Sequence, residues 1–218
     1  MIEEKLNDIY KELPPDVKLV AVSKLQPFES LCEAYRAGQR AFGESRPQEL
    51  AQKVSLAEGM QCEWHFIGHL QTNKLKMVLP YVSLVQSVDS LRLLEAIDDW
   101  GGKNGKVTDV LLEMRIAAED SKQGFAEEEI LELMFRHDDF RHVRICGLMG
   151  MATNTDDADV VDADFARIED FFLYLKDLFP EFEEFCELSI GMSGDWRLAL
   201  RHSATMVRIG TSIFGDRM

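Results

Sequence analysis

The sequence predicts an α/β fold: a single closed (β/α)8 barrel with an extra helix at its amino end. Short apolar runs rich in valine and isoleucine alternate with longer segments of helical periodicity, the pattern of repeated βα units around a parallel sheet. The chain of 218 residues has the length of one such barrel. No shift in composition marks a linker, so residues 1–218 are expected to form one domain.

The first expected element is a helix over residues 2–13, which would cover the barrel wall left bare by the short segment after the last strand. Strands are expected at residues 19–22, 41–43, 63–67, 84–88, 107–115, 143–149, 187–190 and 206–209. Helices are expected at residues 28–37, 47–56, 74–79, 91–100, 127–136, 164–178 and 195–202. Asp89-Ser90 provides an amino-terminal cap, and Pro47 occupies a first helical position, where its missing N–H costs nothing.

This alternation favours a closed barrel over an open doubly wound sheet. An open sheet that binds dinucleotides carries a glycine-rich turn after its first strand. Here that turn reads Ser23-Lys-Leu-Gln-Pro27 and contains no glycine.

Composition excludes several kinds of partner. The 39 acidic and 24 basic residues give a formal net charge of −15, which opposes binding to nucleic acid and otherwise belongs to a solvated surface. No run approaches the roughly 18 apolar residues of a membrane span, and the charged amino end does not resemble a secretory signal. The four scattered cysteines contain no CxxC pair, which is typical of a reduced, cytoplasmic protein.

Candidate site residues lie where the apolar runs break, because the carboxyl ends of the strands build the site of a barrel. Lys24 follows the first strand, and a partly desolvated lysine amine there can add to an aldehyde as a Schiff base. The turns Gly191-Met192-Ser193-Gly194 and Gly210-Thr211 offer backbone amides and hydroxyls that suit a phosphate. Together these groups suit a phosphorylated aldehyde. The alternatives are a solvated Lys24 and glycines that only form tight turns.

Arg208 ends the last strand, which in a closed barrel lies about 4.8 Å from the first. Its guanidinium is expected to face the ring of a cofactor held by Lys24. Because arginine only donates hydrogen bonds, it would keep a pyridine nitrogen unprotonated, which favours storage or limited chemistry. The alternative is an ion pair with a core carboxylate such as Glu113.

No metal site is predicted. His65 and His69 have the i, i+4 spacing of a metal-binding pair, but on a strand and turn this spacing does not place them on one face. They are expected to line a pocket or, for His65, to lie satisfied in the core.

Long motifs at these strand ends carry a family resemblance. The chain resembles, essentially end to end, the pyridoxal phosphate homeostasis proteins, which look like the amino-terminal barrel of alanine racemase without its second domain. The motifs are Val20-Ala-Val-Ser-Lys24, Phe42-Gly-Glu44, Trp64-His-Phe-Ile-Gly-His-Leu-Gln-Thr-Asn-Lys74, Ser87-Val-Asp-Ser90, Lys122-Gln-Gly-Phe125, Gly147-Leu-Met-Gly-Met151, Leu188-Ser-Ile-Gly-Met-Ser193 with Asp195, and Val207-Arg-Ile-Gly-Thr-Ser-Ile-Phe-Gly215.

The resemblance implies that Lys24 forms an internal aldimine with pyridoxal 5′-phosphate (PLP) and that Arg208 faces the pyridine nitrogen. It implies that Ser193, Gly210 and Thr211 hold the phosphate. Met192, in the same turn as Ser193, is expected to contact the cofactor as well.

Two positions depart from the family pattern. Ser45 stands where asparagine normally follows Phe-Gly-Glu, which is expected to remove a polar contact near the ring. Ser203-Ala204-Thr205 stands where Gly-Ser-Thr is usual, which is expected to delete a hydroxyl near the phosphate while Thr205 keeps one. Ser45 and Thr205 are thus expected among the cofactor-binding residues, with weaker retention of PLP than in typical relatives.

The expected function is a PLP-binding protein of vitamin B6 homeostasis without significant catalysis. It is expected to be a monomer or weak dimer, with PLP-dependent apoenzymes as candidate partners. Racemisation needs a second acid or base, which the resemblance says alanine racemase takes from its second domain and partner subunit. One alternative is a small amino-acid racemase that pairs Lys24 with His65 or Cys62. Another is a sugar-phosphate enzyme that uses Lys24 without PLP.

Overall fold

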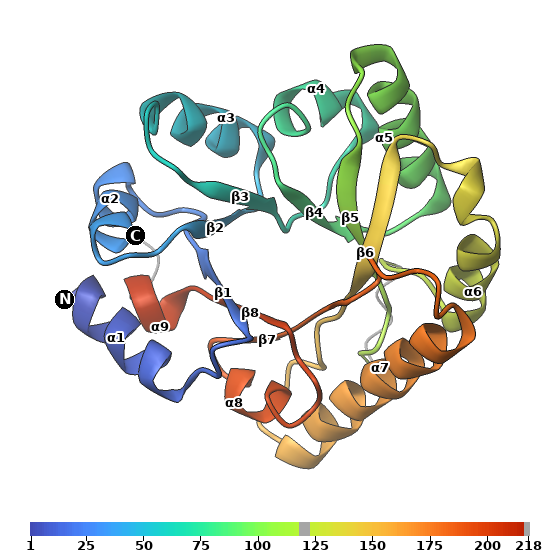
Figure 1. Cartoon of the computed structure of the whole chain (residues 1–218). Helices are drawn as coiled ribbons and strands as arrows, with labels where there is room; N and C mark the ends of the chain where they lie inside the picture. Colours follow the sequence, from blue (N-terminus) through green and yellow to red (C-terminus); the bar gives the residue numbers. More distant parts are fainter. Residues whose placement is uncertain (118–122, 216–218) are drawn as a thin grey trace.

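The computed structural model describes residues 1–117 and 123–215. Within these residues the strands form a closed parallel barrel in the order β1-β2-β3-β4-β5-β6-β7-β8 (Figure 1). This confirms the predicted fold class. The strands are β1 (Lys18–Val22), β2 (Ala41–Glu44), β3 (Glu63–Phe66), β4 (Leu84–Val88), β5 (Thr108–Glu113), β6 (Val143–Met149), β7 (Glu187–Met192) and β8 (Met206–Ile209).

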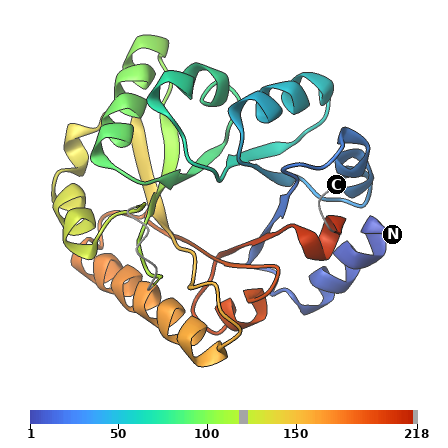
Figure 2. The same cartoon turned by 180° about the vertical axis from the view of Figure 1, so that it is seen from behind.

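Helices surround the barrel as an outer ring in both views (Figures 1 and 2). The helix α1 packs against α2 and α9, so it covers the wall where β1 meets β8, as predicted. The helices are α1 (Ile2–Glu12), α2 (Phe28–Arg36), α3 (Pro47–Leu56), α4 (Leu75–Val78), α5 (Leu91–Asn104), α6 (Glu127–Phe135), α7 (Ala158–Leu178), α8 (Trp196–Ala199) and α9 (Thr211–Phe214), with short 3-10 turns at Thr72–Lys74 and His137–Asp139.

Pairing between β1 and β8 closes the ring. Lys18 pairs with Met206 and Ala21 with Ile209, in parallel register. On its other side β1 pairs with β2, where Val22 lies opposite Gly43. The carboxyl ends of strands that lie far apart in the sequence therefore meet at one end of the barrel.

Apolar side chains fill two separate spaces. A large cluster lies between the strands and the helices. A small cluster unites residues of β1, β2, β4, β5, β6 and β8 without any helix residue, so it lies inside the barrel; its members are Val20, Ala41, Leu84, Leu111, Cys146, Met149 and Met206. Side chains alternate along a strand, so the next inward positions after Leu84, Leu111 and Met206 are the polar residues Gln86, Glu113 and Arg208.

Several helix boundaries differ from the prediction. Helix α7 begins at Ala158 rather than at residue 164, because the Asp157 side chain accepts a hydrogen bond from the Asp159 N–H and caps it there. Helix α5 continues through Gly101 to Asn104. Glycine is required at position 101 for packing and does not end the helix, because a Cβ there would lie 2.5 Å from the His142 side chain. Helix α8 ends at Ala199 instead of at residue 202. Among the described helices, none is long and apolar enough to cross a membrane.

Candidate functional site at the carboxyl end of the barrel

Lys24 follows the buried Ser23 at the end of β1 and is itself half-buried. The Ser23 N–H donates to the Gly43 carbonyl (3.1 Å), which continues the β1–β2 ladder by one residue. Leu25 then takes the left-handed conformation, with a φ of 60°, and turns the chain away from the strand. A non-glycine residue in that conformation costs about 1 kcal/mol or more, so surrounding contacts must hold it.

A buried ion cluster supplies those contacts. Lys53 of α3 is 4% exposed and donates to the Ser23 carbonyl (2.6 Å), to Glu44 Oε1 (2.7 Å) and to Glu49 Oε1 (2.8 Å). Glu49 also accepts from the Leu25 N–H (2.7 Å), and Glu44 accepts from the Ser23 hydroxyl (2.6 Å). Burial raises the pKa of Glu44, an effect that Lys53 opposes. The residues on both sides of Lys24 are therefore fixed to α3 and β2.

Arg208 is buried at the end of β8, the strand that pairs with β1, and Lys24 follows β1. Its Nη1 donates to the carbonyl (2.8 Å) and hydroxyl (2.6 Å) of Ser189, and its Nη2 donates to the Gly150 carbonyl (2.9 Å). Burial lowers the pKa of Arg208 to about 10, opposed by Glu113 and Asp195, so the group stays charged near neutral pH. These bonds use three of its five N–H groups. They go to Ser189 and Gly150 rather than to Glu113.

Ser193 and Gly210 meet at the ends of β7 and β8. The Gly210 N–H donates to Ser193 Oγ (3.1 Å). Because this oxygen accepts, the Ser193 hydroxyl hydrogen can be donated to a phosphate oxygen. A Cβ added at Gly210 would lie 3.3 Å from Val22, so the glycine brings this turn close to the end of β1. Thr211 is exposed at the start of α9, where the first N–H groups of a helix have no partner within it.

Met192 and Ser45 flank these residues. Met192 pairs with Arg208 in the β7–β8 ladder and is 36% exposed. Ser45 follows β2 as Lys24 follows β1, two residues beyond the Val22–Gly43 pair. A Cβ added at Gly68 would lie 2.3 Å from the Ser45 carbonyl, so the loop after β3 needs glycine to pass Ser45.

Thr205 lies at the opposite end of the barrel, so its predicted place beside the phosphate is wrong. It precedes β8, its carbonyl accepts from the Lys18 N–H at the start of β1, and its hydroxyl donates to Glu187 at the start of β7. At about 3.3 Å per residue, the length of β8 separates Thr205 from Gly210. The buried Ala204 lies at the same amino end, so its missing hydroxyl does not bear on the phosphate turn.

The two residues considered as a second racemase base do not lie at the carboxyl end. Cys62 precedes β3, and burial raises the pKa of its thiol to about 11. His65 is buried inside β3 and lies within hydrogen-bonding distance of Gln86 (2.8 Å) and Glu63 (3.1 Å). Among the described residues there is no group of His, Cys, Asp and Glu that could hold a metal ion. Lys122, part of one family motif, lies outside the described residues.

Glu113 ends β5 on the inward-facing side. It is 4% exposed, and its Oε2 has no hydrogen-bond partner among the described residues. Burial raises the pKa of Glu113 to about 7, reinforced by Asp89 and opposed by Arg208 and His69. Sequence reasoning considered Glu113 only as a partner for Arg208.

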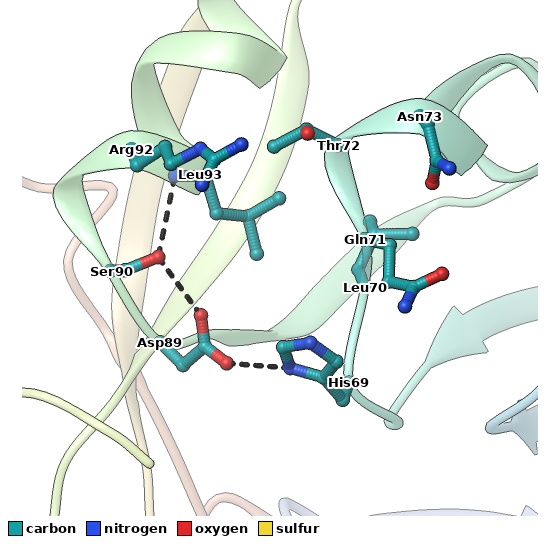
Figure 3. Close-up of a pocket in the computed structure, with 9 residues that line it drawn as sticks. All are labelled: His69, Leu70, Gln71, Thr72, Asn73, Asp89, Ser90, Arg92 and Leu93. Atoms are coloured by element: carbon teal, nitrogen blue, oxygen red, sulfur yellow. Dashed lines mark hydrogen bonds and ion pairs between the residues drawn. The ribbon is translucent and has the colours of Figure 1, made fainter. Parts of the chain in front are cut away.

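A pocket of about 410 Å³ occupies the same end of the barrel over β3 and β4 (Figure 3). His69 points toward Asp89 across its floor, with Nδ1 2.9 Å from Oδ2, while Arg92 and Thr72 lie on the far side. Its lining contains neither Lys24, Arg208 nor Ser193, so it is separate from the site formed by β1, β7 and β8.

The fold and site define a class, the barrel proteins of alanine-racemase type: the family model described as "Alanine racemase, N-terminal domain" matches residues 1–218. A relative from Haemophilus influenzae named pyridoxal phosphate homeostasis protein is 36% identical, over 100% of this chain and 93% of that protein. A relative of the same name from Schizosaccharomyces pombe is 35% identical, over 93% of this chain and 85% of that protein. The chain belongs to the pyridoxal phosphate homeostasis protein family.

Solved structures of related proteins have the same fold. PipY of Synechococcus elongatus without PLP has a TM-score of 0.93 and 36% identity, covering 99% of this chain and 100% of PipY. Its structure with PLP bound has a TM-score of 0.92. Alanine racemase from Corynebacterium glutamicum, at 16% identity and a TM-score of 0.76, shares the fold, with 99% of this chain matching 60% of that one.

Proposed function

We propose that this protein binds PLP covalently through Lys24 and serves in intracellular PLP homeostasis. The observation that carries the proposal is the meeting of three groups on neighbouring strands: the segment of Lys24 after β1, the Arg208 guanidinium of β8, and the hydrogen-bonded pair of Ser193 after β7 and Gly210 after β8. A PLP-bound structure of the related PipY supports it.

Each group of the cofactor has a matching donor. Lys24 would hold the aldehyde group of PLP covalently, because a lysine amine can form a Schiff base with an aldehyde. The Ser193 hydroxyl and the amides of the turn at Gly210 and Thr211 suit the phosphate. The N–H groups of Arg208 that Ser189 and Gly150 do not use suit the pyridine nitrogen, which would accept a hydrogen bond from them. We propose that Met192, level with Arg208, and Ser45, level with Lys24, flank the ring.

We propose a binder with little or no catalysis rather than a racemase. A tyrosine could serve as the second acid or base that racemisation needs. The four tyrosines lie in helices or just after one, away from the strand ends; they are Tyr10, Tyr35, Tyr81 and Tyr174. Cys62 and His65 lie away from the carboxyl end as well. PLP-dependent apoenzymes are the recipients we propose, with the protein acting in the cytoplasm as a monomer or weak dimer; scattered cysteines support the reducing compartment.

The first prediction is that borohydride reduction of protein incubated with PLP leaves one stable adduct, on Lys24. Peptide mass mapping locates it, and the Lys24→Ala variant should lose both the adduct and the visible absorption of bound PLP. Lys11→Ala is the matched control, because Lys11 is an exposed lysine on α1. Label scattered over surface lysines, with none on Lys24, would contradict the proposal.

A further inference from the structure

A chain of hydrogen bonds crosses the barrel interior and ends on Arg208. Arg208 Nη1 donates to Ser189 Oγ (2.6 Å), and the Ser189 hydroxyl donates to Gln86 Oε1 (2.8 Å). Gln86 Nε2 lies 2.8 Å from His65 Nδ1, and His65 Nε2 lies 3.1 Å from Glu63 Oε1. The side chains of Ser189, Gln86 and His65 are fully buried. The chain thus connects β8, β7, β4 and β3 without reaching solvent until Glu63.

The chemistry of each group fixes the direction of every bond. An amide nitrogen only donates, so His65 Nδ1 accepts from Gln86 and the imidazole hydrogen lies on Nε2, where it is donated to Glu63. The hydrogen bond from His65, opposed by partial burial and aided by Lys18, lowers the pKa of Glu63 to about 2. With the imidazole hydrogen on Nε2, a turned-over Gln86 amide would place its oxygen against the lone pair of His65 Nδ1, and two acceptors would face each other. The contact with His65 therefore determines the orientation of Gln86, which directs Oε1 to the Ser189 hydroxyl.

Gln86 in turn determines where the Ser189 hydroxyl points. With its hydrogen directed to Gln86 Oε1, the Ser189 oxygen presents its lone pairs to Arg208 Nη1. If Gln86 were apolar, this hydroxyl hydrogen would lack its acceptor inside the barrel and the hydroxyl would be free to rotate. Gln86 also contacts Met206 Sδ (2.9 Å), two residues before Arg208 on the inward side of β8.

We propose that Gln86 is a positioning residue for Arg208, holding the guanidinium through Ser189 in the plane that faces the cofactor ring. This inference rests on the proposed function, since it concerns the same site. It assigns a role to a residue inside the barrel that lies in none of the turns that would contact PLP.

The test is Gln86→Met, which keeps the length of the side chain and removes both of its polar groups. Its matched control is Gln39→Met, because Gln39 is equally buried (1% exposed) and the substitution also removes buried hydrogen bonds. Gln39 donates to the carbonyls of Leu19 and Ala41 and accepts from the Tyr10 hydroxyl, and none of these partners belongs to the chain that ends on Arg208. Both variants should lower the midpoint of urea unfolding. Only Gln86→Met should weaken PLP binding, on the order of tenfold, and shift the absorption maximum of bound PLP.

Titration of PLP into each variant, followed by absorbance, separates the outcomes. Wild-type affinity and spectrum in Gln86→Met, or an equal change in Gln39→Met, would overturn the inference while leaving the Lys24 adduct and the proposed function intact. Wild-type protein without a Lys24 adduct would overturn both. If Gln86→Met does not fold, Ser189→Ala decides the question: a shifted spectrum is expected, and an unchanged one contradicts the role of the chain.

Discussion

At the scale of single residues, the buried carboxyl of Glu113 is in an environment that disfavours its charged form. Its carboxyl is almost fully buried, one oxygen lacks a partner, and Asp89 adds a second negative charge nearby. Arg208 and His69 offset this only in part. The folded protein therefore retains a proton on Glu113 at pH values where the unfolded chain releases it.

The direction of the resulting pH dependence follows from the raised pKa. Burial first, and then Asp89, raises the pKa of Glu113 from 4.5 to about 7. The contribution of Glu113 to the free energy of unfolding is therefore greatest below pH 4.5, falls as the pH rises to 7 and then stays constant. Glu113→Gln removes this loss. We expect it to stabilise the protein by on the order of 3 kcal/mol at pH 8 and by much less at pH 5, measured by urea unfolding. An equal effect at both pH values would show that Glu113 is already ionised at pH 5.

Which site residues the sequence reveals depends on where they lie along a strand. Lys24, Arg208 and Ser193 are visible because each interrupts an apolar run at the functional end. Lys53 was missed because it reads as one charge on a helix; its only signal is Glu49, four residues earlier, which marks a possible ion pair without revealing burial. Thr205 was misplaced because a motif alone does not say at which end of β8 it lies.

At the scale of elements, Gly147 determines how β6 meets β7. The β5–β6 register shifts between Val110 and Leu111, so Cys146 is the extra residue of a bulge and Gly147 follows it with a φ of 151°. A Cβ at Gly147 would lie 1.8 Å from the Glu187 carbonyl oxygen. Since this oxygen belongs to the backbone of β7, only movement of a strand could make room.

Gly147→Ala is therefore expected to destabilise the protein by at least about 3 kcal/mol, measured by urea unfolding. Gly194→Ala is the control, because a Cβ there meets nothing within 4 Å and its φ is not positive. It should stay close to wild type. Wild-type stability in Gly147→Ala would mean that β6 and β7 can separate at little cost.

The order of strands and longer helices was predictable from the sequence, whereas the short elements and several ends were not. Helix α9 follows a glycine turn and has only four residues, too few to show a periodic pattern. The helix predicted over residues 91–100 was too short, because α5 continues through Gly101, where close packing against His142 leaves room only for glycine. The caps at Ser90 and Pro47 were read correctly because capping is local chemistry.

At the scale of the whole molecule, closure of the ring depends on contacts between the two ends of the sequence. Residues 18–21 of β1 pair only with β2 and with residues 206–209 of β8. Proteins dominated by such distant contacts fold slowly, because the entropy of closing the loop is lost before the contacts form.

A chain that stops at Thr205 should therefore lack cooperative unfolding. Without β8, both β1 and β7 would have an open edge, and the inward-facing Met206 would be missing from the interior cluster. Far-ultraviolet circular dichroism during a urea titration, compared with the full chain, checks this. A sharp transition near the wild-type midpoint would show that seven strands suffice.

The same β1–β8 pairing has a consequence for biosynthesis. While the ribosome still holds β8, Lys24 has already emerged, yet Arg208 and Gly210 cannot reach it. A nascent chain thus displays the Lys24 amine without the other groups of the proposed site. On the function proposed above, loading with PLP follows the emergence of β8 from the ribosome, and PLP cannot act as a template for the early steps of its own carrier's folding.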